Sequence, residues 1–332
     1  MWKKRAITTA VGIAVAALAL SGCSGDSSSD GGATGGDAGS GEKPYIALIS
    51  KGFQHQFWQA VKAGAEQAAA EFDVEVTFEG PDTEADVDQQ VQMLQTALDK
   101  SPDAIGIAAL DSQAVGPLLD QAQSQDIPVI AFDSGVDSDI PLTTAATDNL
   151  AAAAEAAAQM AEAIGGEGKV AMVVHDQTSL TGQQRRDGFV EYMEANEPGI
   201  EIVDIQYGGG DPAQSADLAK AMISANPDLA GIYGSNEGSA IGVVQAVDEL
   251  GLEDGSLTIV GFDSGAAQID AITSGTMLGA ITQNPVGIGY ETVKAAVEAI
   301  NGESLPETID TGFYWYTSDN IDDDEIRAVL YD

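Results

Sequence analysis

The sequence predicts an α/β protein built from two doubly wound parallel-sheet domains of similar topology. Short, continuously apolar runs alternate with longer amphipathic segments, which is typical of parallel sheets covered by helices on both faces. The chain also repeats itself after about 125 to 130 residues. Ile127–Gly135 returns as Leu257–Gly265, both ending in Phe-Asp-Ser-Gly, and Pro102–Ile107 returns as Pro227–Ile232. Two matches in the same order indicate two similarly folded halves rather than a solenoid, whose period is ~20 to 50 residues.

The first 22 residues are predicted to form a secretory signal peptide. Basic residues near the start precede an apolar run from Ala6 to Leu20, which is too short for a membrane span of ~20 residues. The run closes in Leu20-Ser-Gly-Cys23, which holds the single cysteine of the chain and resembles a bacterial lipobox. The resemblance implies lipidation at Cys23. The alternative is an ordinary signal peptide with a chance cysteine.

Residues 23–43 are predicted to form a flexible tether. Between Ser24 and Gly41 the chain is almost wholly Gly, Ser, Ala, Thr and Asp, a composition that cannot bury enough apolar surface to fold. Signal, lipidated cysteine and tether together predict an extracytoplasmic lipoprotein. We expect it on the outer face of the cytoplasmic membrane of a Gram-positive cell, or in the periplasm if the cell is Gram-negative.

Composition excludes several kinds of partner. The chain carries 53 acidic and 13 basic residues, a formal charge of −40. This charge disfavours nucleic acid and anionic lipid, so we expect contact with a membrane through the lipid anchor only. One cysteine allows neither an intrachain disulfide nor a cysteine-ligated metal site. We expect no cofactor and no metal.

From Tyr45 on, the first half alternates strands, which are short apolar runs, with helices, which are amphipathic. The predicted strands are Tyr45–Ile49, Val74–Phe78, Ala104–Ala108, Val129–Phe132 and Thr143–Ala146. The predicted helices are Phe57–Glu71, Asp86–Lys100, Ala114–Gln125 and Leu150–Ile164.

The second half repeats the alternation. Its predicted strands are Lys169–Val174, Glu201–Gln206, Leu229–Tyr233, Thr258–Phe262 and Met277–Ile281. Its predicted helices are Gly182–Glu194, Pro212–Ser224, Ser239–Leu250, Ala267–Ser274 and Ile288–Ile300.

Two aspartates hold matching places at strand ends. In parallel α/β sheets ligands bind outside the carboxyl ends of the strands. Asp133 and Asp263 each follow a strand and precede Ser-Gly, so each carboxylate is expected in the crevice between the domains. There it can accept hydrogen bonds from two hydroxyls of a sugar or polyol. The alternative for each is a cap on the following helix, but the matched pair favours ligand contact.

Aromatic and polar side chains follow the first strand. A flat ring suits the C–H face of a sugar, and neighbouring polar groups can bind its hydroxyls. We therefore predict ligand contact for His55 and Trp58 ahead of a core role, and leave Phe57 open between the two.

Polar side chains follow other strands too. Asn236 and Gln283 are predicted ligand contacts, whereas Asp111 fits a helix cap equally well. Arg185 is the candidate in the pair Arg185-Arg186, with a surface helix pair as the alternative.

Known catalytic motifs are missing from the sequence. It has no Gly-x-Ser-x-Gly elbow, phosphate loop, His-Glu-x-x-His or Gly-x-Gly-x-x-Gly after a strand. Asp133 and Asp263 could imitate glycosidase carboxylates, but carboxylates on facing domains are better placed to clamp a ligand. The acidic run Asp322–Glu325 lacks the spacing of a calcium loop and is predicted to be a solvated tail. We expect a binding protein without catalytic residues.

From Tyr45 to about Ile326 the chain resembles the ribose-type substrate-binding proteins of ABC sugar importers, also called type I periplasmic binding proteins. The matching segments are Phe57-Trp58, Ile127–Asp133, Asp148-Asn149, Arg185–Phe189, Asn236-Glu237, Val260–Asp263 and Gln283. The resemblance implies a three-segment hinge near Thr147, Asn284 and Gly312. It thereby implies one lobe at 44–147 plus 284–311 and another at 148–283 plus 312–332.

The resemblance also implies the function. It implies a monomer that captures a neutral sugar or polyol between closing lobes and delivers it to an ABC permease. The implied ligand contacts are His55, Phe57, Trp58, Asp133, Asn236, Asp263 and Gln283. Alternatives are a signalling receptor for a chemoreceptor, a sensor kinase or a quorum sugar, and a secreted glycoside-processing enzyme.

This chain departs from the family's ribose binders at several positions. His55 and Ala108 stand where those proteins have Asn, and Ser134 and Gln183 where they have Arg. An aromatic residue is also missing near Gly210. These departures favour a different polyhydroxylated ligand over D-ribose.

Overall fold

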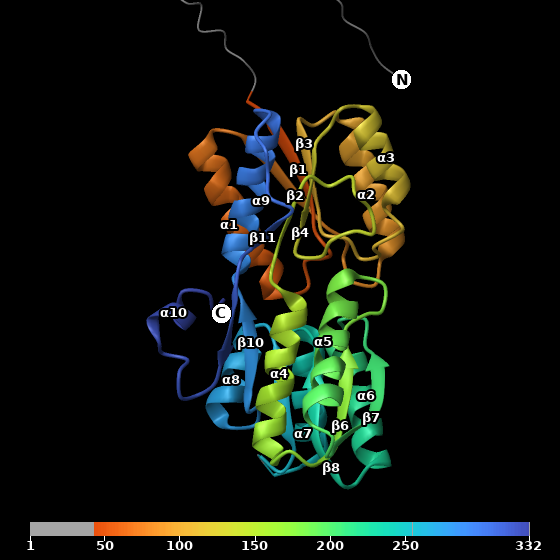
Figure 1. Ribbon diagram of the computed structural model, residues 1–332, viewed down its shortest axis with the longest axis vertical. Helices are drawn as coiled ribbons and strands as arrows, with labels where there is room; N and C mark the ends of the chain where they lie inside the picture. The colour runs from red at the N-terminus through yellow and green to blue at the C-terminus, as the bar shows by residue number, and fades with distance from the viewer. Residues whose placement is uncertain (1–42, 254, 332) are drawn as a thin grey trace, which may run out of the picture. The chain divides into compact units, whose positions relative to one another are not determined.

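Two six-stranded sheets carry the fold, and helices cover both faces of each (Figure 1). The computed structural model describes residues 43–253 and 255–331. The predicted signal peptide, Cys23 and the tether as far as residue 42 lie outside the described residues. Among the described helices, none is both long and apolar enough to cross a membrane.

The first sheet comes mainly from the first half of the chain. Its strands are β1 (Tyr45–Ile49), β2 (Glu75–Glu79), β3 (Ala104–Ile107), β4 (Val129–Phe132), β5 (Thr144–Ala146) and β11 (Thr308–Asp310). They lie in the order β11-β5-β4-β3-β1-β2 and all pair in parallel.

The second sheet repeats this plan. Its strands are β6 (Gly168–Val174), β7 (Ile200–Tyr207), β8 (Leu229–Gly234), β9 (Thr258–Phe262), β10 (Gly279–Gln283) and β12 (Phe313–Tyr316). The order is β12-β10-β9-β8-β6-β7, and β12 alone is antiparallel to its neighbour among these strands. The predicted similarity of the two halves is confirmed, because each half places its first strand between its second and third.

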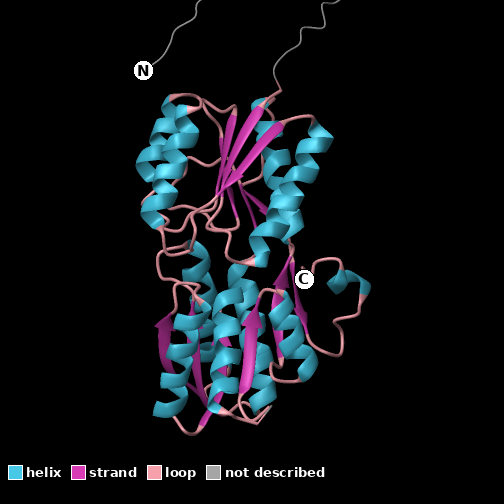
Figure 2. Cartoon of the chain, turned by 180° about the vertical axis from the view of Figure 1, so that it is seen from behind, coloured by secondary structure: helices cyan, strands magenta, loops and turns pink. Residues whose placement is uncertain are grey.

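Nine helices predicted from the amphipathic runs are present, with ends that differ by a few residues. They are α1 (Gln56–Phe72), α2 (Val87–Asp99), α3 (Gly116–Ser124), α4 (Asn149–Ile164), α5 (Leu180–Asn196), α6 (Pro212–Ala225), α7 (Glu237–Leu250), α8 (Ala266–Ser274) and α9 (Pro285–Ile300). We call the first sheet with α1, α2, α3 and α9 the first lobe, and the second sheet with α4 to α8 the second lobe. Figure 2 shows the two lobes from behind.

The strands are apolar along their whole length because both faces of each sheet are buried. In β1, Ile46 and Leu48 pack on the face covered by α1 and α9, whereas Ala47 and Ile49 pack on the face covered by α2 and α3. Alternate side chains of a strand point to opposite faces, so a strand that is buried on both sides needs a continuous apolar run.

The chain passes between the two sheets three times, after β5, after β10 and after β11. The predicted crossings at Thr147, Asn284 and Gly312 lie in these connections. Thr147 Oγ1 donates a hydrogen bond to Gly312 O at 3.4 Å, so two of the connections touch. The lobe boundaries inferred from the sequence stay a prediction.

The strands β11 and β12 and the short helix α10 (Asp324–Arg327) were not predicted. Strands of three or four residues are too short to show a period of their own. They form only because β5 and β10 offer them an edge to pair with.

Candidate functional site

A small cavity lies between the two lobes at the carboxyl ends of the strands. Its volume is about 20 Å³. The residues that line it are Lys51, His55, Phe57, Trp58, Glu84, Asp133, His175, Thr181, Arg185, Asn236, Asp263 and Gln283. Every residue predicted to contact a ligand is in this set.

The matched aspartates lie at the ends of β4 and β9 with left-handed backbones. The φ angle is 55° at Asp133 and 82° at Asp263. Asp and Asn tolerate this region better than other residues with side chains. The carboxylate of Asp263 accepts hydrogen bonds from Glu237 N at 2.9 Å and Gln283 Nε2 at 2.7 Å, neither of which belongs to the following helix. The helix-cap alternative is therefore wrong for Asp263.

The carboxylate of Asp133 makes no hydrogen bond to another residue in the described part of the chain. The side chain is 5 % exposed, and the backbone N–H donates to Ala145 O at 2.9 Å. The helix-cap alternative is therefore wrong for Asp133 as well. Asp133 lines the cavity, where a ligand could supply the missing donor.

Gln283 presents a second unused acceptor. Its Nε2 donates to Asp263 Oδ1, which orients the amide and leaves Oε1 buried without a partner. A buried acceptor of this kind costs free energy unless a donor reaches it. The cavity therefore favours a molecule that carries hydroxyl donors.

Arg185 is buried, so the surface-pair alternative is wrong for it. Its Nε donates to Asn149 Oδ1 at 2.8 Å, and its guanidinium lies 3.7 Å from the centroid of the Phe262 ring. One terminal nitrogen is 4.0 Å from Asp263 Oδ2. Arg186, in contrast, is only partly buried and pairs with its neighbour Asp187.

The aromatic residues serve both the core and the cavity. Phe57 and Trp58 make an edge contact with centroids 4.9 Å apart, and both belong to the apolar cluster of the first lobe. Both also line the cavity. Core packing and exposure to the cavity are thus compatible, because both residues lie in the first turn of α1, where the helix begins after β1.

Four cavity residues were not among the predicted contacts: Lys51, Glu84, His175 and Thr181. Lys51 Nζ donates across the cleft to Thr181 Oγ1 at 3.2 Å. Its position just after the first strand could have indicated from the sequence that Lys51 lies at the cavity. Thr181, near the start of α5, had no such signal. His175 lines the cavity directly after β6.

Glu84 lies in the acidic stretch Asp82–Asp86, whose composition is typical of a solvated loop. Its side chain instead turns inward, where Oε1 accepts from Trp58 Nε1 at 2.7 Å and Oε2 accepts from Asn236 Nδ2 at 3.3 Å. Burial opposes its ionisation, but His55 and Lys51 hold the pKa of Glu84 below its usual value. Only the folded loop distinguishes Glu84 from its acidic neighbours.

Burial shifts the ionisation of two more cavity residues. It raises the pKa of Asp133 to about 6, although the charges of Lys51 and Arg185 act in the opposite direction. Burial and the charge of Lys51 lower the pKa of His175 to about 3. His175 is therefore neutral at physiological pH, with Nδ1 2.8 Å from Ser235 Oγ.

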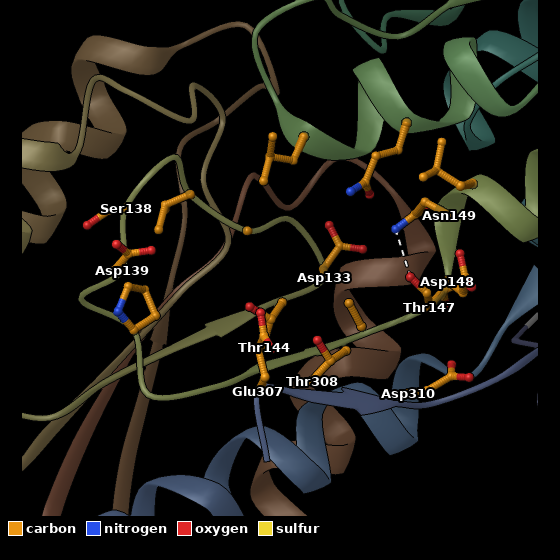
Figure 3. A pocket seen from close by; sticks show the side chains of 17 residues that line it. Asp133, Ser138, Asp139, Thr144, Thr147, Asp148, Asn149, Glu307, Thr308 and Asp310 are labelled. Carbon is orange, nitrogen blue, oxygen red and sulfur yellow. Dashed lines mark hydrogen bonds between the residues drawn. The ribbon is translucent and has the colours of Figure 1, made fainter. Parts of the chain in front are cut away.

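An outer groove opens beside the cavity and shares Asp133 with it (Figure 3). Its volume is about 560 Å³. Asn149 Nδ2 donates to Thr147 O at 2.9 Å, so one of the connections between the lobes forms part of its wall. The described residues hold no cluster of three or more His, Cys, Asp or Glu suited to a metal ion.

Residues 46–304 match the family model of the periplasmic binding protein domain. The chain belongs to this family. Its fold, with two parallel-sheet lobes around one cavity, agrees with the membership.

Several proteins similar to this binding protein are named for a sugar or have been solved with a sugar bound. It is 28% identical to the D-allose-binding periplasmic protein of Escherichia coli K12 over 270 residues, 78% of this chain and 86% of that one. A solved ABC transporter solute-binding protein from Agrobacterium vitis, bound with α-D-tagatopyranose, is 33% identical. It covers 87% of this chain and 100% of its own, with a TM-score of 0.84. A protein from Agrobacterium radiobacter in complex with D-arabinose is 31% identical over 87% and 99%, with the same TM-score.

Proposed function

We propose that this binding protein captures a neutral sugar or polyol between its lobes and delivers it to an ABC importer permease. The observation that carries the proposal is a pair of cavity acceptors beside two aromatic rings: the buried Oε1 of Gln283, which has no partner, and the Asp133 carboxylate, which accepts no hydrogen bond from a described residue. Hydroxyl groups supply the missing donors, and the rings suit the C–H face of a sugar. The sugar-binding relatives support the same ligand class.

The charges of the cavity favour a neutral ligand. Lys51 and Arg185 face three carboxylates, those of Glu84, Asp133 and Asp263. Both cations already have partners in the protein. A phosphate or carboxylate would find no free cation there and would be repelled by the acids, whereas a hydroxyl can donate to them.

Binding requires the lobes to part and close again. A cavity of about 20 Å³ has room for about one water molecule. Ordinary ligand sites measure ~300 Å³ or more. We infer that the ligand enters an open form, and that contacts to both lobes then favour the closed form, since a ligand on one lobe alone would not shift the equilibrium.

The lipid anchor and the tether would position the protein at the membrane. Cys23, once lipidated, would anchor the protein to the membrane, and the tether would let the lobes reach the permease. The protein acts as a monomer, without a cofactor, and releases its ligand chemically unchanged.

A thermal-shift screen of residues 44–332 tests the proposal. The panel contains D-allose, D-tagatose, D-arabinose, D-fucose, D-ribose, xylitol and the inositols. We expect one class to raise Tm by several degrees, since a ligand at a hundredfold excess over its Kd adds ~2.7 kcal/mol. The bound sugar should be recovered unchanged. A sugar that is consumed would indicate an enzyme, and no shift at all would indicate a different ligand class.

The ligand affinity should depend on pH through Asp133. Because ligand hydroxyls donate to the ionised carboxylate, we expect the association constant to fall as the pH drops below the pKa of about 6, by up to ~10-fold per pH unit. The stability of the ligand-free protein has the opposite sign. The raised pKa favours the folded state at low pH, and this contribution is lost as the pH rises from the ordinary value of 3.8 through about 6.

Titration of the Asp133→Asn variant checks this assignment. We expect the variant to lose the part of the pH dependence between pH 5 and 7 that comes from Asp133. His175 cannot substitute for it, since its pKa of about 3 keeps it neutral throughout this range. An identical pH profile in the variant and the wild type would contradict the assignment.

A further inference from the structure

Helix α1 of the first lobe is capped by a residue of the second lobe. Its own N-cap residue, His55, makes no side-chain capping bond. Glu237, at the start of α7, supplies the cap from across the cleft: Oε1 accepts from Gln56 N at 3.2 Å and Oε2 accepts from Phe57 N at 3.3 Å. A carboxylate is well suited to this place, because the N-terminus of a helix has free N–H groups and a partial positive charge.

The reverse contact exists as well. Helix α8 of the second lobe begins after Gly265, which has no side chain to cap it. The side chain of Gln56, from the first lobe, fills the role: its Oε1 accepts from Ala266 N at 2.8 Å. Gln56 thus caps α8 of the second lobe with its side chain. The backbone N–H of the same residue is capped by Glu237 of the second lobe.

Close packing keeps the two caps together. A Cβ atom on Gly265 would lie 3.0 Å from Gln56 Oε1 and 3.0 Å from Glu237 Cδ, so a side chain at this position would crowd both caps. Glu237 is tied to the cavity through its backbone, since its N–H donates to Asp263 Oδ2 at 2.9 Å. Neither Glu237 nor Gln56 lines the cavity itself.

We propose that Glu237 and Gln56 are positioning residues that set the ligand affinity by capping a helix of the opposite lobe when the lobes close. The proposal rests on the proposed function, in which closure accompanies binding. Both caps join the lobes, so both are lost when the lobes part. They therefore shift the closing equilibrium without touching the ligand, and the apparent Kd depends on that equilibrium.

The test uses the mature chain with Gln56→Ala, Glu237→Ala or both. Closure is measured without ligand, as the distance between two spin labels. The labels are attached to cysteines that replace exposed Asp88 of α2 and exposed Glu191 of α5, in a background in which Cys23 is replaced by Ser. Affinity is measured with the sugar of the screening panel that binds the wild type best. Glu194→Gln is the matched control, because it removes one charge from the exposed face of α5.

We expect each single substitution to lower the closing equilibrium constant by about tenfold, the usual cost of a lost helix cap. If the ligand-free wild type is mostly closed, the change appears as a longer distance between the labels. If it is mostly open, the change appears as a tenfold higher Kd. The rank order of the panel sugars should stay the same, and Glu194→Gln should change nothing.

An unchanged distance distribution together with an unchanged Kd would overturn the proposal. A changed rank order would overturn it too, since that would mean direct contact with the ligand. Gln56→Ala keeps the test valid if Glu237→Ala does not fold, because Gln56 is exposed. If the wild type binds no sugar, the proposed function fails, but the label distances still decide whether the caps hold the lobes together.

Discussion

The double substitution Asp133→Asn/Asp263→Asn is expected to raise the Kd for the sugar ligand by about 10²- to 10⁴-fold. Each carboxylate is expected to accept charge-assisted hydrogen bonds from ligand hydroxyls, worth ~1.5–3 kcal/mol apiece. Asn is chosen because its side chain has nearly the size and shape of that of Asp. It also tolerates the left-handed backbone at φ 55° and 82°, where Ala would be strained. Isothermal titration calorimetry gives the Kd directly.

Asp111→Asn is the matched control. Asp111 also follows a strand of the first sheet, but its carboxylate accepts from Gln113 N and Ala114 N, both at 2.9 Å, and it does not line the cavity. This variant should bind like the wild type. An unchanged affinity in the Asp133/Asp263 double variant would contradict the assignment of the site.

Gly289→Ala is expected to lower the free energy of unfolding by about 2 kcal/mol. Helices α1 and α9 meet through their glycines: a Cβ on Gly289 would lie 1.9 Å from Val61 O, and one on Gly64 would lie 2.0 Å from Val286 O. The methyl group would push the helices apart, which outweighs the gain of ~1 kcal/mol in helix propensity. Calorimetry should show Tm lower by about 4 to 8 °C.

Gly116→Ala serves as the control for that substitution. Gly116 also lies in a helix, but a Cβ there has no neighbour within 4 Å. The variant should be as stable as the wild type or slightly more stable. Equal Tm values for both alanine variants would mean that the contact of α1 with α9 is not tight.

The repeat and the alternation of apolar runs predicted the helices and most strands correctly, because both patterns are local and follow from burial on two faces. The strand Met277–Ile281 was placed two residues early: β10 begins at Gly279. Met277 and Leu278 extend the apolar run before the strand, so the pattern alone does not mark where pairing with β9 begins. The edge strands β11 and β12 depend wholly on partners far away in the sequence.

The sequence by itself determined which polar residues stand at strand ends. Asp133, Asn236, Asp263 and Gln283 were predictable because the carboxyl ends of parallel strands meet at one edge of a sheet. The tertiary structure alone decided which loop and helix residues join them. Glu84 is one acid in an acidic loop, and Glu237 caps α1 only because the other lobe faces it. Such contacts depend on how the two lobes and their loops meet, and no local sequence pattern predicts this arrangement.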